Sequence, residues 1–123
     1  MDDAGRGSHD YSANSGHSGL TTRPLIFGGN VFGWTADRDT SFAVLDVFVE
    51  GGGRMLDTAD VYSRWAPGHK GGESESIIRA WMTSRRQRED VLIVTKVGGE
   101  MNGTRGLAPE RIAANCEASL RLG

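Results

Sequence analysis

Apolar residues along this chain fall into two alternating patterns, which together predict three strand–helix units. Short continuous apolar runs are typical of buried strands, and three occur: 24–27, the residues around Leu56, and 91–97. Apolar residues at helical spacing follow each run: at about 40–50, from Ser74 onwards, and from a first turn containing Pro109. Strands that alternate with helices in this way are typical of an α/β fold with a parallel sheet. Asp39 is the expected N-cap of the first helix and Ser74 that of the second.

The run around Leu56 ends in an aspartate, Asp57, and Tyr62 follows five residues later. At the carboxyl edge of a parallel sheet, where ligands and catalytic groups collect, both side chains could point into one pocket. The plainer interpretation is a strand end followed by a loop tyrosine. The run 91–97 favours the pocket, because its Lys96 needs a partner when it loses water, and Asp57 is the obvious one.

The composition of the chain argues against several classes of function. The chain has 123 residues and a formal net charge of −2, which points to neither nucleic acid nor an anionic membrane as partner. The basic run 85–88 is expected to complement a helix dipole. Cys116 is the only cysteine, so no intramolecular disulfide can form. Because no apolar run approaches the length of a membrane span, we expect a soluble, cytoplasmic protein.

The chain is expected to consist of a disordered amino-terminal tail followed by one folded domain. Residues 1–23 carry few aliphatic side chains and are predicted to be a disordered tail. His9 and His17 in that tail have no cysteine nearby, so no metal site is expected there. Residues 24–123 are predicted to form the folded part.

Three short segments carry a resemblance to a known family. LDTADVY at 56–62, GGESE opening a helix at 71–75, and VTKVG at 94–98 resemble the aldo-keto reductases, in order and at the right separations. The resemblance spans about residues 24–123 and implies a (β/α)8 TIM barrel that reduces carbonyls with NADPH. A complete barrel takes about 250 residues, so this chain would hold only the first three strand–helix units, a truncated barrel.

The resemblance also implies site residues. Asp57, Tyr62 and Lys96 would be catalytic, with Tyr62 as the proton donor to the carbonyl oxygen. The nearby Lys96 ammonium would make the phenol a better acid, and Asp57 would keep that ammonium charged and oriented.

The remaining family positions concern the ligands. Gly29, Asn30 and Asp57 would contact the nicotinamide end of NADP(H). Phe32, Trp34 and Trp65 would border a pocket for a small carbonyl substrate, although Phe32 and Trp34 could equally cap the barrel mouth.

One family position has no counterpart. The fourth catalytic residue is a histidine at the end of the next strand, and His9, His17 and His69 all lie elsewhere. Most of the family's contacts with the cofactor phosphates also come from later strands. An inactive remnant or interaction module therefore remains an alternative, in which the unpaired edges of the sheet lead to self-association.

Overall fold

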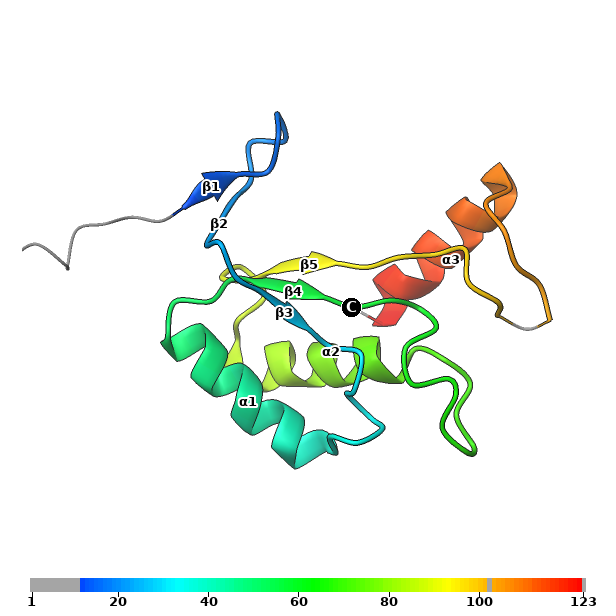
Figure 1. Cartoon of the computed structure of the whole chain (residues 1–123), viewed down its shortest axis with the longest axis horizontal. Coiled ribbons are helices and arrows are strands. Elements are labelled where there is room, and N and C mark those ends of the chain that lie inside the picture. Colours follow the sequence, from blue (N-terminus) through cyan, green and yellow to red (C-terminus); the bar gives the residue numbers. More distant parts are fainter. Residues whose placement is uncertain (1–11, 102, 123) are drawn as a thin grey trace, which may run out of the picture.

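The computed structural model describes residues 12–101 and 103–122, which contain a parallel sheet with helices on one face (Figure 1). The sheet has the strand order β3-β4-β5, so β4 is central. Its strands are β3 (Ile26–Gly28), β4 (Met55–Asp57) and β5 (Leu92–Val94). The α/β prediction is confirmed: this is an open sheet of strand–helix units rather than a closed barrel.

Each strand of the sheet is followed by one helix. The helices are α1 (Arg38–Glu50), α2 (Glu73–Arg85) and α3 (Pro109–Leu122). Figure 1 shows α1 and α2 side by side below the sheet, while α3 begins beyond the end of β5 and packs against α2. The helices lie where the sequence predicts them, since their apolar spacing is long and regular.

The helix caps differ from the prediction. Asp37, rather than Asp39, caps α1, because its Oδ1 accepts a hydrogen bond of 2.8 Å from the Thr40 amide. Gly72 is the N-cap of α2, with a left-handed φ of 82°. Ser74 therefore lies inside α2, and its hydroxyl donates to the Gly29 carbonyl oxygen instead.

The hydrophobic core lies between the sheet and the inner faces of α1 and α2. Its buried members are Phe32, Phe42, Leu45, Leu56, Ile78, Trp81, Met82 and Val91. Removing such apolar surface from water is the main favourable term in folding, at about 25 cal/mol per Å². The core therefore fixes α1 and α2 against β4, the strand that carries Asp57.

A polar contact joins α1 to α2 at the edge of this core. Asp46 accepts hydrogen bonds from the Trp81 indole at 2.8 Å and from Arg85 at 3.0 Å to each carboxylate oxygen. The Arg85 guanidinium and the Trp81 indole keep the pKa of Asp46 below its usual range. This forked arrangement fixes the relative position of the two helices.

The amino-terminal segment, predicted to be a disordered tail, contains a short hairpin in the part that the structure describes. Residues 1–11 lie outside the described residues. From residue 12 onwards the chain forms a small antiparallel hairpin, in which β1 (Ala13–Asn14) pairs with β2 (Thr21–Thr22). Turn glycines and local main-chain hydrogen bonds can hold such a hairpin without a hydrophobic core; here the Ser15 amide donates to Leu20.

Within the described residues, no helix combines the length and the apolar character needed to cross a bilayer.

Candidate active site

Asp57 and Lys96 meet at the carboxyl ends of β4 and β5. Asp57 is the last residue of β4, and Lys96 comes two residues after β5. The Lys96 Nζ lies 2.7 Å from the Asp57 Oδ1, within ion-pair distance. The sequence predicts a single strand over 91–97. In the structure the regular strand ends at Val94, and Lys96 lies in the extended segment that follows it.

Main-chain hydrogen bonds hold that extension in place. The Thr58 amide donates to the Val94 carbonyl at 2.8 Å, and the Asp60 amide donates to the Lys96 carbonyl at 3.2 Å. The Lys96 ammonium then donates to the Thr58 carbonyl at 2.8 Å. Two chain segments far apart in sequence therefore remain aligned past the end of the sheet, and this alignment brings the lysine to the aspartate.

Tyr62 completes the group from the loop that follows β4. The Lys96 Nζ lies 4.8 Å from the centre of the Tyr62 ring, a distance at which a cation is attracted by the ring. The structure thus brings together Asp57, Tyr62 and Lys96, which we call the charged trio.

The charge on Lys96 is stabilised by its neighbours. Burial by itself would lower the pKa of the ammonium, but the polar contacts with Asp57 and Tyr62 outweigh it, so the pKa is raised. Lys96 is therefore an ammonium at neutral pH, next to a phenol that can donate a proton. This combination suits general acid catalysis.

Trp65 lies beside Tyr62 and Trp34 lies beside Trp65, and both tryptophans are far more exposed than Phe32. Trp34 and Trp65 are about half exposed and meet edge to face at 5.4 Å between ring centres. The Trp65 ring centre lies 6.3 Å from that of Tyr62. Phe32 is only 1% exposed and stacks on Phe27 in the core, so in this structure it packs beneath the surface that the two tryptophans share.

Gly29 has a structural role at the end of β3. Its amide donates to the Asp57 carbonyl at 2.8 Å, and its own carbonyl accepts from Ser74 at 2.7 Å. A Cβ at this position would lie 3.1 Å from the Ser74 Oγ, so protein atoms already fill the adjacent space. The glycine is required for close packing, while the neighbouring Asn30 is exposed.

Sequence reasoning missed a pair of buried hydroxyls that support Asp57. The Thr58 Oγ1 and the Ser74 Oγ are 2.8 Å apart, and both side chains are fully buried. Through Gly29 this pair connects the end of β3, the end of β4 and the first turn of α2. The sequence does show Thr58 next to Asp57, which could have suggested a supporting hydroxyl. No spacing rule connects Thr58 to Ser74, so their contact could not be predicted.

Other polar groups at this edge are already engaged. The His69 Nδ1 lies 2.8 Å from the Ser63 carbonyl oxygen, which fixes the imidazole within its own loop. Arg64 faces Glu100 at 3.5 Å. Among the described residues, no group of three or more His, Cys, Asp or Glu side chains is arranged to hold a metal.

Comparison with known proteins places these features in a family. The profile of the aldo/keto reductase family matches residues 24–122. An uncharacterised 11.2 kDa protein from the crtE 3′ region of Pseudescherichia vulneris is 52% identical over 91 residues, covering 73% of this chain and 88% of that protein. Norsolorinic acid reductase B of Aspergillus parasiticus is 32% identical over 112 residues, covering 85% of this chain but 27% of the reductase.

Solved structures give the same result. The aldo-keto reductase AKR11C1 of Bacillus halodurans superimposes with a TM-score of 0.71 at 28% identity, covering 90% of this chain and 35% of that protein. A Pseudomonas aeruginosa protein assigned to the same group has a TM-score of 0.76 at 30% identity, covering 93% and 41% respectively. The chain therefore spans well under half the length of these reductases, but most of the short bacterial relative.

Proposed function

This chain belongs to the aldo/keto reductase family, and from that premise we propose that it supplies the proton-donating group for NADPH-dependent reduction of an aldehyde or ketone. The observation that carries the proposal is the position of the Lys96 ammonium, 2.7 Å from the Asp57 carboxylate and 4.8 Å from the Tyr62 ring centre. A titratable phenol beside a fixed cation is the arrangement that this chemistry requires.

Each member of the charged trio has one role. The Tyr62 hydroxyl donates its proton to the carbonyl oxygen as charge develops there. The Lys96 ammonium stabilises the negative phenolate that remains, and Asp57 orients the ammonium and keeps it charged. When bound, NADPH supplies the hydride that reduces the carbonyl carbon. Trp65, which packs on Tyr62, and Trp34, which packs on Trp65, are half exposed and would border the substrate.

The residues present fit only one end of the cofactor. Asn30 is exposed, it follows Gly29, whose amide donates to the Asp57 carbonyl, and it can hydrogen-bond an amide, so it would face the nicotinamide. Of the basic side chains near these strand ends, Lys96 already faces Asp57 and Arg64 already faces Glu100. Cofactor phosphates need several such donors, so we assign them to parts of a complete reductase that have no counterpart among the described residues.

A chimaera tests the proposal directly. Residues 24–122 would replace the matching segment of AKR11C1, and NADPH oxidation with a simple aldehyde would be followed. If the trio acts as proposed, Tyr62→Phe and Lys96→Met each lower kcat by about 10²-fold or more, while Lys70→Met, at an exposed lysine, has little effect. An active chimaera that is indifferent to Tyr62→Phe would refute the role given to the trio.

An interaction module is the second candidate function, favoured by the open sheet. In the part of the chain that is described, β3 and β5 each have one unpaired edge, and Ile26 and Val94 on them are exposed. Such edges can pair with another chain. We propose self-association as the form that this interaction takes.

A further inference from the structure

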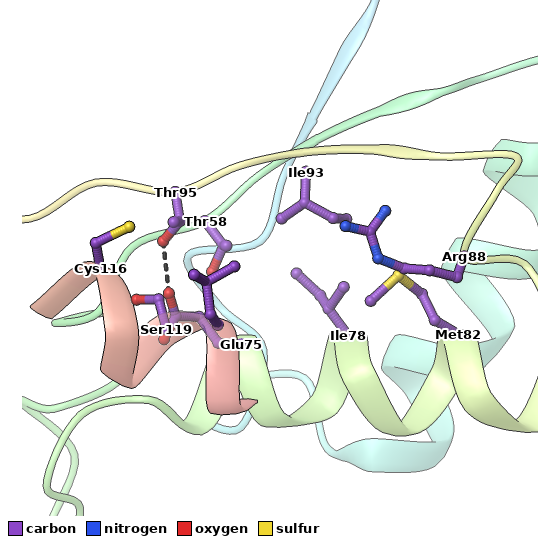
Figure 2. A pocket seen from close by; sticks show the side chains of 10 residues that line it. Thr58, Glu75, Ile78, Met82, Arg88, Ile93, Thr95, Cys116 and Ser119 are labelled. Carbon is purple, nitrogen blue, oxygen red and sulfur yellow. Dashed lines mark hydrogen bonds between the residues drawn. The ribbon is translucent and has the colours of Figure 1, made fainter. Parts of the chain in front are cut away.

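A separate cavity of about 130 Å³ lies between α2, α3 and the segment around β5, and it opens to solvent beside exposed lining residues such as Cys116 and Leu120 (Figure 2). No member of the charged trio lines it. Its walls have distinct characters at the two ends, as Figure 2 shows: aliphatic side chains and Arg88 at one, and oxygen-bearing side chains at the other. The cavity therefore has an apolar end and a polar end, and a ligand with the same two ends would bind in one orientation.

The apolar end is formed by Ile78 and Met82 on α2 and by Ile93 on β5. Ile78 and Met82 are almost fully buried, so these walls are fixed by core packing. In another protein, an apolar cavity of about 150 Å³ binds benzene. This cavity consequently has room for an apolar group of roughly five or six non-hydrogen atoms.

The polar end has four oxygen-bearing side chains, Thr58, Glu75, Thr95 and Ser119 (Figure 2). The Thr58 hydroxyl already shares a hydrogen bond with Ser74, which leaves the other three to face a ligand. Glu75 is 5% exposed and accepts a hydrogen bond from the Thr95 hydroxyl. Ser119 is 8% exposed, and its Oγ has no hydrogen-bond partner in the described part of the chain. A buried hydroxyl without a partner is costly, so this end is ready for a ligand atom.

The charge around Glu75 is not balanced by a direct ion pair. No ion pair among the described residues involves Glu75 or the nearby buried Asp60. Burial, and next the negative charge of Glu75, raise the pKa of Asp60. Arg111 offsets this only in part, as the last of the causes acting on the pKa of Asp60, and its Nη2 donates to the Thr104 carbonyl oxygen. Because buried carboxylates are normally paired, a cation is the missing partner.

We propose that this cavity binds a short primary alkylammonium ion, with its ammonium between Glu75, Thr95 and Ser119 and its alkyl chain against Ile78 and Ile93. An ammonium has three donors and no acceptor, which matches three oxygen acceptors of which one is a carboxylate. The Arg88 guanidinium at the other end repels a second positive charge, so the site selects monoamines over diamines. This ligand and site lie outside the reductase chemistry.

Cys116 provides the readout, because it borders the cavity, is exposed and is the only cysteine. Its alkylation by iodoacetamide is followed by mass spectrometry at neutral pH, with glutathione in the same tube as an internal standard. At about ten times its Kd, n-butylamine leaves about a tenth of the cavities free and slows alkylation about tenfold. The uncharged 1-butanol and the dication 1,4-diaminobutane should protect far less.

Matched variants decide whether Glu75 is responsible. Glu75→Gln keeps the shape and an acceptor for Thr95, and it should abolish protection by n-butylamine. Glu117→Gln removes a carboxylate from the exposed side of α3, where its side chain is 68% exposed, and should leave protection unchanged. Ser119→Ala is a second variant, expected to weaken binding about fivefold through the lost hydrogen bond.

The proposal is overturned if 1-butanol protects Cys116 as well as n-butylamine does, or if n-butylamine gives no protection. It is equally overturned if protection survives Glu75→Gln. Circular dichroism of each variant establishes that it is folded, and Ser119→Ala carries the test should Glu75→Gln unfold. The outcome does not depend on reductase activity.

Discussion

At the scale of single residues, Lys96 shows how the site depends on main-chain geometry. Its ammonium donates to the Asp57 carboxylate and to the Thr58 carbonyl, two adjacent groups at the end of β4. The side chains of Lys96 and Asp57 are 47% and 34% exposed, so water screens their attraction. The contact consequently contributes little to stability, and its value lies in fixing the orientation of the cation.

The pH dependence of the Lys96 contribution follows from its raised pKa. Lys96→Met should lower the free energy of unfolding by roughly 0.5–1 kcal/mol at neutral pH. Because the folded pKa lies above the unfolded value of about 10.4, this contribution is fully present below that pH. It is lost as pH rises through the folded pKa, so parent and variant should converge in strong alkali. Urea titrations at neutral pH and above the unfolded pKa measure the difference.

Arg121→Met is the control for that experiment. Arg121 faces Glu117 at 3.6 Å, but both side chains are more than two-thirds exposed. Its removal should change stability by no more than a few tenths of a kcal/mol. A Lys96→Met effect of the same size, or one that does not change with pH, would contradict the stabilised-cation interpretation.

At the scale of elements, the turn between α1 and β4 determines how closely the helix packs on the sheet. The amides of Gly51, Gly52 and Gly53 all donate to carbonyls of the last turn of α1. Gly53 then passes directly under Phe48, which packs on Phe27 at 5.5 Å between ring centres. The turn therefore requires glycine at position 53, where a side chain would collide with Phe48.

Replacing Gly53 should be much more costly than replacing Gly51. A Cβ at Gly53 would lie 2.4 Å from the Phe48 ring, so Gly53→Ala displaces Phe48 and should cost roughly 1–3 kcal/mol. Gly51 has a φ of −75°, and its Cβ would meet the carbonyl oxygens of Val47 and Phe48 at 3.4 and 3.6 Å, close to ordinary contact distance. Gly51→Ala should therefore change stability by about 0.5 kcal/mol or less. Thermal melts of both variants test this, and equal losses would show that Phe48 can move freely.

Helix α3 shows where an element's own pattern and its packing disagree. Ile112, Cys116 and Leu120 recur at helical spacing, yet all three are exposed. The buried Ser119 and the nearby Arg111 instead carry polar atoms without partners. The reason is that α3 packs against α2 at the edge of the sheet, where no further described strand is available to cover its apolar stripe.

At the scale of the whole molecule, the open sheet predicts self-association. Light scattering should give a mass above the monomer that rises with concentration. Lysine at Ile26 or Val94 places charge on an exposed sheet edge and should reduce association, whereas Val47→Lys, at a 69% exposed position on α1, should not. A monomer at every concentration, or an equal effect of Val47→Lys, would count against edge pairing.

We also expect this chain, by itself, to reduce carbonyl compounds poorly or not at all. The charged trio is assembled, but the donors for the cofactor phosphates are not, and binding energy from those remote groups is what positions the nicotinamide. Tryptophan fluorescence from Trp34 and Trp65, beside the trio, should show no saturable quenching by micromolar NADPH. Saturable binding, with aldehyde reduction that Tyr62→Phe abolishes, would show that the chain suffices as an enzyme.

The sequence by itself determined the strand–helix order and the family. Short apolar runs and apolar residues at helical spacing are local properties, so the helices and the carboxyl end of β4 could be located from the sequence pattern alone. The pairing of Lys96 with Asp57 could also be anticipated, because a charge in an apolar run needs a partner. These inferences depend only on residues that are neighbours in the chain, or on the high free-energy cost of burying an unpaired charge.

Tertiary structure alone decided what each side chain contacts. Phe32 and Trp34 are two residues apart and both aromatic, yet Phe32 is in the core and Trp34 is half exposed. Gly29 has a structural role because Ser74, 45 residues later, fills the space beside it. The cavity near Glu75 is formed by two helices and a strand that no local pattern relates. Such contacts depend on how elements meet in space, and this is fixed by packing of the whole core.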